Sequence, residues 1–144
     1  MKAITIDALW AWAIMQGIKR VENRTWPTKY RGRLAIHAGQ SRRRDEAARA
    51  ALEALGVDVP DDVPRGVLLG TVELDDVVDV REATQQTFCD LGPVGLRNDP
   101  LATGPICWLL SRPEPLADPV PIGGRLSLWN VDDALLKGAK GLKD

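Results

Sequence analysis

Alternation of apolar and polar side chains with a two-residue period is the feature that most constrains the fold of this chain. Residues 33–38 and 67–74 both show it. Successive side chains of a strand point to opposite faces of a sheet, so this period predicts half-buried β-strands. Together with shorter apolar or β-branched runs, the sequence predicts about six strands, at residues 2–6, 18–26, 33–38, 67–74, 106–110 and 125–131.

Two segments favour helices most clearly. The first follows Asp7 as an N-cap and ends at Gly17, and the second follows Ser41 and ends at Gly56. The second carries an apolar stripe at helical spacing, formed by residues 48, 51, 52 and 55. Because the strands come in runs separated by single helices, the sequence predicts an α+β fold with a curled, mostly antiparallel sheet or a small barrel.

The chain has 144 residues, which suits one domain. We expect that domain to span residues 1–136, and residues 137–144, with two glycines and three lysines, to form a flexible tail. A short helix is plausible near residues 83–91. The prolines of residues 113–124 predict a connection between strands.

Several classes of protein and site are excluded. The longest uncharged apolar stretch, residues 8–18, is far shorter than the ~20 residues that span a bilayer, and Asp7 before it argues against a signal peptide. We therefore expect a cytoplasmic protein without a membrane segment, and a monomer.

One histidine, His37, and two cysteines outside any CxxC motif, Cys89 and Cys107, are too few for a zinc cage. We expect no metal or cofactor, and reduced cysteines in the core.

Positive charge is concentrated in residues 19–44, which hold nine basic residues and one acid, Glu22. This segment carries +8, so the rest of the chain carries −9 to reach the net charge of −1. Such asymmetry favours a surface that faces a polyanion, although each single charge is also explained as a solvated surface group. The residues expected to bind nucleic acid are Arg24, Trp26, Lys29, Tyr30, Arg31, His37, Arg42, Arg43 and Arg44.

These residues suit different parts of a nucleotide. Trp26 and Tyr30 offer flat faces for base stacking, among cations that contact phosphates. Residues 42–44 lie in the first turn of the second expected helix, where a bound phosphate would offset the unfavourable dipole; a solvated arginine run is the alternative. His37 could act as an acid or base near neutral pH, or serve as a hydrogen-bonded structural residue.

Six motifs follow one another along the chain. They are Trp12-Ala13, Gly17-x-Lys19-x-x-Glu22-x-Arg24, Arg31-Gly32, Ile36-His37-Ala38, Gly70-Thr71-Val72-Glu73 and Gly124-x-Leu126-x-Leu128-Trp129. In this order they resemble the ASCH family, a branch of the PUA-like superfamily. The resemblance implies a small β-barrel flanked by helices, a cleft formed by residues 19–24, and RNA or a modified nucleoside as the ligand.

One class of small bacterial ASCH-type enzymes hydrolyses the acetyl amide of N4-acetylcytidine with a lysine, a threonine three residues later and a strand glutamate. By this resemblance Lys19 and Glu73 take the lysine and glutamate positions, and Glu22 stands where the threonine would be. Glu22 or Glu73 could then activate water as a general base, or all three could form a structural ion network. For Lys19 and Glu22 to line one pocket, a bulge or turn must interrupt the strand near Arg20 and Val21.

The first prediction is therefore a module that binds single-stranded RNA, another single-stranded nucleic acid or a modified nucleotide, in a basic cleft lined by Lys19, Glu22, Arg24 and Glu73. The alternatives are an amidohydrolase acting on an N4-acylated pyrimidine nucleoside, or a metal-independent ribonuclease, with Lys19, Glu22 and Glu73 as catalytic residues. A further alternative is an adaptor that binds a basic partner through Asp75, Asp76 and Asp79.

Overall fold

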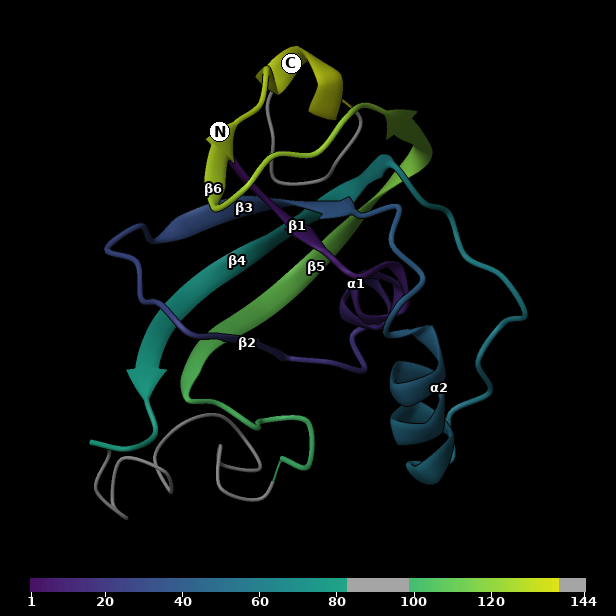
Figure 1. The fold of residues 1–144 in the computed structure, drawn as a ribbon. Coiled ribbons are helices and arrows are strands. Elements are labelled where there is room, and N and C mark those ends of the chain that lie inside the picture. Colours follow the sequence, from purple (N-terminus) through teal and green to yellow (C-terminus); the bar gives the residue numbers. More distant parts are fainter. Residues whose placement is uncertain (83–98, 138–144) are drawn as a thin grey trace.

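The computed structural model describes residues 1–82 and 99–137. One six-stranded sheet with the order β2-β5-β4-β3-β1-β6 forms its centre (Figure 1). The elements are β1 (Lys2–Ile6), α1 (Ala8–Met15), β2 (Val21–Arg24), β3 (Gly32–Ala38), α2 (Asp45–Ala54), β4 (Val67–Asp79), β5 (Ile106–Pro121), β6 (Leu128–Asn130) and the 3₁₀ helix η2 (Asp133–Leu136).

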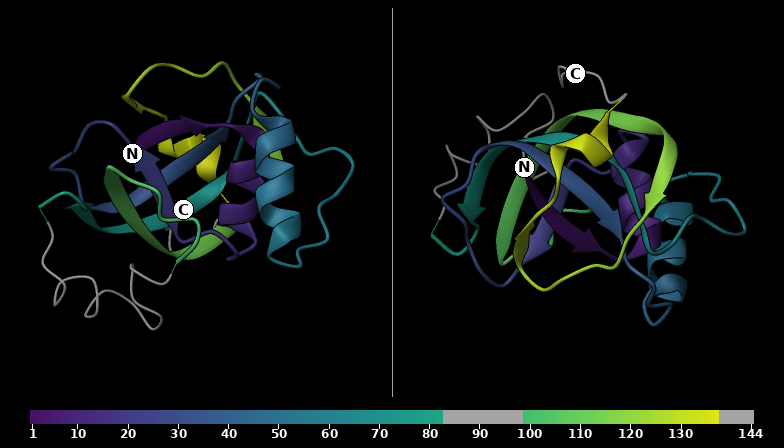
Figure 2. Two further views of the ribbon diagram at one scale, coloured as in Figure 1. Left: turned by 60° about the horizontal axis from the view of Figure 1, so that its bottom comes forward. Right: turned by 90° about the horizontal axis from the view of Figure 1, so that it is seen from above.

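The sheet is mixed, because β1 pairs with β3 in parallel while the other four pairings are antiparallel. Figure 2 shows the strands curving around a common interior, with α1 and α2 together on one side. The predicted α+β class, with about six mostly antiparallel strands curled beside helices, is confirmed. Within residues 1–82 and 99–137, no helix is long and apolar enough to cross a bilayer.

Two apolar clusters lie on opposite faces of the sheet. Leu34 and Ile36 belong to the larger one, which also contains the buried residues of α1, whereas Ala35 belongs to the smaller one with Trp129. The two-residue period of β3 is thus confirmed as burial on alternate faces. Cys107 is buried and free, as predicted, whereas Cys89 and the helix expected near residues 83–91 lie outside the described residues.

Both helices end just before the expected glycines, and α2 is less buried than α1. Gly17 and Gly56 have φ of 77° and 81°, a left-handed conformation that favours glycine after a helix. The expected start of α2 at Ser41 is wrong: the helix begins at Asp45, because residues 43–44 form a turn and Arg44, with φ of −108° and ψ of 8°, is not helical. The Ser41 hydroxyl accepts from the backbone N–H of Arg43 ahead of this turn. The apolar stripe of α2 is also shorter than expected, since Leu55 is 46% exposed.

Both long strands continue beyond their expected ends. β5 includes the prolines at 113, 115, 119 and 121, so the predicted connection over residues 113–124 is largely strand. The pairing of β4 with β5 shifts register between residues 68 and 70, 71 and 73, and 74 and 76. Bulges of this kind tolerate proline, because they interrupt the ladder of backbone hydrogen bonds.

Candidate functional site

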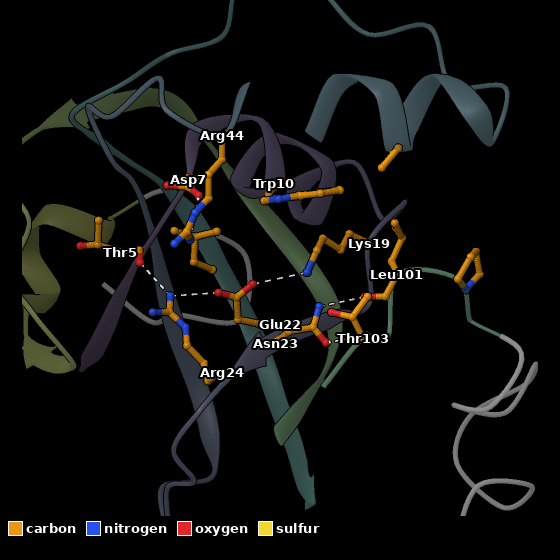
Figure 3. A pocket seen from close by; sticks show the side chains of 13 residues that line it. Thr5, Asp7, Trp10, Lys19, Glu22, Asn23, Arg24, Arg44, Leu101 and Thr103 are labelled. Atoms are coloured by element: carbon orange, nitrogen blue, oxygen red, sulfur yellow. Dashed lines mark hydrogen bonds and ion pairs between the residues drawn. The ribbon is translucent and has the colours of Figure 1, made fainter. Parts of the chain in front are cut away.

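A pocket of about 340 Å³ opens where the end of β1 and the start of α1 face β2. Its lining includes Thr5, Asp7, Trp10, Lys19, Glu22, Asn23, Arg24, Arg44, Leu101 and Thr103 (Figure 3). We call this cavity the Lys19 pocket. It contains three of the residues that the sequence placed in one cleft, namely Lys19, Glu22 and Arg24.

The turn after α1 brings Lys19 over the first residues of β2. The backbone N–H of Lys19 donates to the carbonyl of Ala13 at 3.1 Å, and β2 begins only at Val21. The expected irregularity near Arg20 is therefore present, and it allows Lys19 and Glu22 to share a side of the backbone. The Lys19 ammonium lies 3.3 Å from Glu22 Oε1 and also donates to the carbonyl of Val21.

Glu22 and Arg24 lie two residues apart on β2 and so project from the same face. Arg24 Nη2 lies 2.9 Å from Glu22 Oε2 and donates to the Thr5 carbonyl at 2.8 Å. The result is a row of cation, carboxylate and cation, with a net charge of +1 (Figure 3). Lys19 is 3% exposed and Glu22 8%, so these two members of the row are buried, whereas Arg24 is half-buried; buried charges are stable when they are paired in this way.

Other walls of the pocket come from α1, the turn before α2 and residues 101–104. The Trp10 ring centroid lies 5.4 Å from the Lys19 ammonium, within cation–π range. Arg44, with a side chain that is 76% exposed, stands at the rim and lies 3.5 Å from Asp7. The lining of the pocket thus includes an accessible cation and an aromatic ring.

Asn23 was not predicted as a site residue, yet it builds one wall. Its amide donates to the Leu101 carbonyl at 2.9 Å and accepts from the backbone N–H groups of Thr103 and Gly104 at 3.0 and 2.9 Å. These bonds hold residues 101–104 against β2. An uncharged amide amid the charges of β2 is the only local signal of this role, and it does not reveal a partner some eighty positions away.

The expectation that Glu73 lines the same cleft is wrong. Glu73 lies 3.5 Å from Arg33 and 3.4 Å from Arg112, and it does not line the Lys19 pocket. Its neighbours in β4, Val72 and Leu74, belong to the larger apolar cluster, so Glu73 projects from the opposite face of the strand. The register of β4, which only pairing with β3 and β5 fixes, decides this placement.

Trp26 and Tyr30 are held by the protein itself and do not line the pocket. The Trp26 ring meets Trp108 edge-on at 4.9 Å between centroids, and its carbonyl accepts from the Trp108 indole N–H at 3.3 Å. The Tyr30 hydroxyl donates to the Arg33 carbonyl, and burial raises the pKa of that hydroxyl. Neither ring is therefore the free stacking platform that the sequence suggested.

Most cations of residues 19–44 do not gather around the pocket. Arg31 lies 3.3 Å from Asp76, and Arg42 lies near Asp45 and Asp62, at 3.9 and 3.7 Å. Lys29 and Arg43 are exposed and do not line the pocket. The idea of one hollow for the whole segment is wrong, because Arg31 and Arg42 fold against acids and Lys29 and Arg43 face solvent elsewhere. Of the cations in this segment, only Lys19, Arg24 and Arg44 line the cavity.

His37 lies at a second cavity, of about 480 Å³. It is 1% exposed, with Nδ1 3.2 Å from the Thr5 hydroxyl and Nε2 2.6 Å from the Ile122 carbonyl oxygen. These contacts fit the structural alternative for His37 rather than contact with a ligand in the Lys19 pocket. Within the part of the chain that the structure describes, no three His, Cys, Asp or Glu side chains gather as a metal site would require.

Comparison with known proteins identifies the family of this chain and two similar proteins. The ASCH domain model matches residues 4–102. Activating signal cointegrator 1 of Homo sapiens is 30% identical over 143 residues, which cover 95% of this chain and 23% of that protein; for the Mus musculus protein the values are 31%, 137 residues, 91% and 22%. This chain thus spans less than a quarter of the length of either relative.

A solved structure supports the fold. The crystal structure of ASCH from Zymomonas mobilis superimposes with a TM-score of 0.53 at 17% identity, over 93% of this chain and 89% of that one. At this identity the likeness concerns the architecture alone.

Proposed function

The chain belongs to the ASCH domain family, and from this premise we propose that it binds single-stranded RNA, with one nucleotide seated in the Lys19 pocket. The observation that carries the proposal is the row of the buried Lys19 and Glu22 with the half-buried Arg24, at a cavity large enough for a ligand. Pockets for small ligands have volumes of about 300–1,000 Å³, so a cavity of about 340 Å³ suits one nucleotide. A cavity toward which a few polar groups converge is the usual form of a ligand site.

The chemistry of the walls suits the parts of a nucleotide. The row contributes polar groups in a site of low dielectric, where hydrogen bonds to a base are strengthened. Trp10 offers an aromatic wall, and stacking of a base on such a ring contributes about 1–3 kcal/mol. Arg44 at the rim is an exposed cation for a phosphate, in place of the larger arginine cluster that the sequence predicted.

A titration of a labelled single-stranded oligonucleotide, followed by fluorescence anisotropy at two salt concentrations, tests this proposal. Binding should weaken as salt rises, because phosphate contacts release counterions. Arg44→Ala should weaken binding and reduce the salt dependence by about one phosphate contact. Arg81→Ala is the matched control, since Arg81 is also exposed and also paired with an aspartate, Asp79, but lies outside the pocket. Absent or salt-independent binding would contradict the proposal.

A second candidate is hydrolysis of an N4-acylated pyrimidine nucleoside in the same pocket. The contact between the buried Lys19 ammonium and Glu22 favours it, because a carboxylate held in this way can take a proton from attacking water. Glu73 cannot assist from its place between Arg33 and Arg112. Release of free acid from N4-acetylcytidine by the wild type, lost in Lys19→Met, would support hydrolysis; shortened RNA as the product would instead indicate a ribonuclease.

A further inference from the structure

The hydrogen-bonding capacity left free at the floor of the Lys19 pocket matches one nucleobase, and we propose that the pocket selects guanine. This inference rests on the proposed function, since it names which base the same cavity binds. It follows from a count of the donors and acceptors that Lys19, Glu22 and Arg24 already use.

Lys19 has one donor to spare. Its ammonium carries three N–H groups, and within the described residues two acceptors face it, the Val21 carbonyl and Glu22 Oε1. The side chain is fixed by these contacts and by the nearby Trp10 ring. One N–H group is therefore available beside the carboxylate.

Glu22 has two acceptor positions to spare. An ionised carboxylate oxygen can accept two hydrogen bonds, and here each oxygen has one cationic neighbour, Lys19 at Oε1 and Arg24 at Oε2. Arg24 Nη2 adds no donor to the row, because that nitrogen already faces Glu22 and the Thr5 carbonyl. Arg24 Nε is buried and has no hydrogen-bond partner within the described residues, so it is one further donor, on the Arg24 side of the carboxylate. Its role is to fix the carboxylate in position.

On Lys19 and Glu22 the free groups thus follow the order donor, acceptor, acceptor: the Lys19 ammonium, Glu22 Oε1 and Glu22 Oε2. Cytosine presents the same order on its Watson–Crick edge, and guanine is its complement, with O6 as acceptor followed by N1–H and the N2 amino group as donors. Guanine can therefore make three hydrogen bonds with the row. Single-stranded RNA exposes this edge, because its bases are unpaired.

The other bases fit less well. Adenine offers one acceptor and one donor, and cytosine offers two acceptors and one donor, so each base makes at most two of the three bonds. Uracil offers acceptor, donor, acceptor, which sets a carbonyl oxygen against Glu22 Oε2. An acceptor left facing another acceptor in a buried site is costly, so the row rejects uracil most strongly.

The first test varies only the ligand. Four oligouridylates of equal length carry guanine, inosine (which lacks the N2 amino group), N1-methylguanine or uracil at one central position, and their affinities are measured by anisotropy with the wild-type protein. We expect guanine to bind best, inosine about tenfold more weakly, and N1-methylguanine no better than uracil, since a good pair of base contacts is worth about 1–3 kcal/mol.

The second test varies the protein. Glu22→Gln replaces one acceptor by a donor, so it should abolish the advantage of guanine over inosine; Glu73→Gln, which changes a glutamate paired with arginines outside the pocket, should preserve it. Thermal unfolding of each variant checks that it folds, and the comparison of ligands on the wild type needs no variant.

The outcomes separate the two proposals. Equal, salt-dependent affinity for all four oligonucleotides, or a preference for uracil, overturns guanine selection and leaves RNA binding standing. Absence of binding to every oligonucleotide overturns both.

Discussion

Replacing Glu22 by glutamine should cost this protein much of its stability, because the substitution removes the carboxylate that pairs with both Lys19 and Arg24. Lys19 is 3% exposed and would be left buried without its carboxylate partner. The Arg24 side chain is 24% exposed, so it is partly solvated. The buried lysine therefore dominates the expected loss.

Breaking a buried ion pair by removing one partner costs about 3–5 kcal/mol, and we expect the lower end of this range because the Glu22 side chain retains 10% exposure. Lys19→Met should cost less, about 1–2 kcal/mol, since Arg24 still lies 2.9 Å from Glu22 and neutralises it. The double variant should be more stable than Glu22→Gln alone, because no unpaired buried lysine is left.

Urea unfolding of the four proteins, followed by the fluorescence of the five tryptophans, gives the free energy of unfolding of each. From these values the coupling energy of Lys19 and Glu22 follows as a double-mutant cycle, and we expect about 1–3 kcal/mol. The coupling should change little between low and high salt, because screening acts mainly on exposed charges. A loss below about 1 kcal/mol in Glu22→Gln, or an equal loss in Lys19→Met, would refute the reasoning.

Three other predictions concern residues outside the row. Trp26→Ala should lower the free energy of unfolding by about 2 kcal/mol while leaving RNA affinity unchanged, because the ring packs on the core; a loss of affinity in a stably folded variant would contradict this. Gly124→Ala should destabilise by about 1–3 kcal/mol, since its Cβ would meet side chains of β1 and β3 at 2.6 and 2.9 Å, whereas Gly123→Ala has open space; equal unfolding midpoints would contradict the packing. Tyr30, the only tyrosine, has its pKa raised by burial, so its absorbance should titrate above pH 10 and stability should fall as pH rises past the unfolded pKa of about 10; titration at or below that pH would contradict it.

The fold could be predicted from local patterns, with errors where long-range pairing decides. The alternation in residues 33–38 and the glycines after both helices are properties of neighbouring residues, and the structure confirms them. The prolines of β5 misled the prediction, because their tolerance depends on register shifts with β4 that no local pattern shows.

The candidate site also combines residues that a local motif predicts with residues whose place depends on distant partners. Lys19, Glu22 and Arg24 follow from one motif, since positions 22 and 24 share a strand face and a turn precedes the strand. Glu73 was misplaced, because only its pairing partners fix which face of β4 it occupies. Asn23 was missed, because its partners lie in residues 101–104.

By itself, the sequence determined the kinds of element, the faces of the strands and the cation–carboxylate–cation motif, because each depends on spacing along a few residues. Only the tertiary structure decided which cations stay beside a cavity and which are neutralised. That choice depends on distances between acids and bases far apart in the chain: Arg31 meets Asp76 and Arg33 meets Glu73, while Lys19 and Arg24 share Glu22 inside a pocket. Electrostatic attraction at these distances acts only after the backbone has brought the partners together.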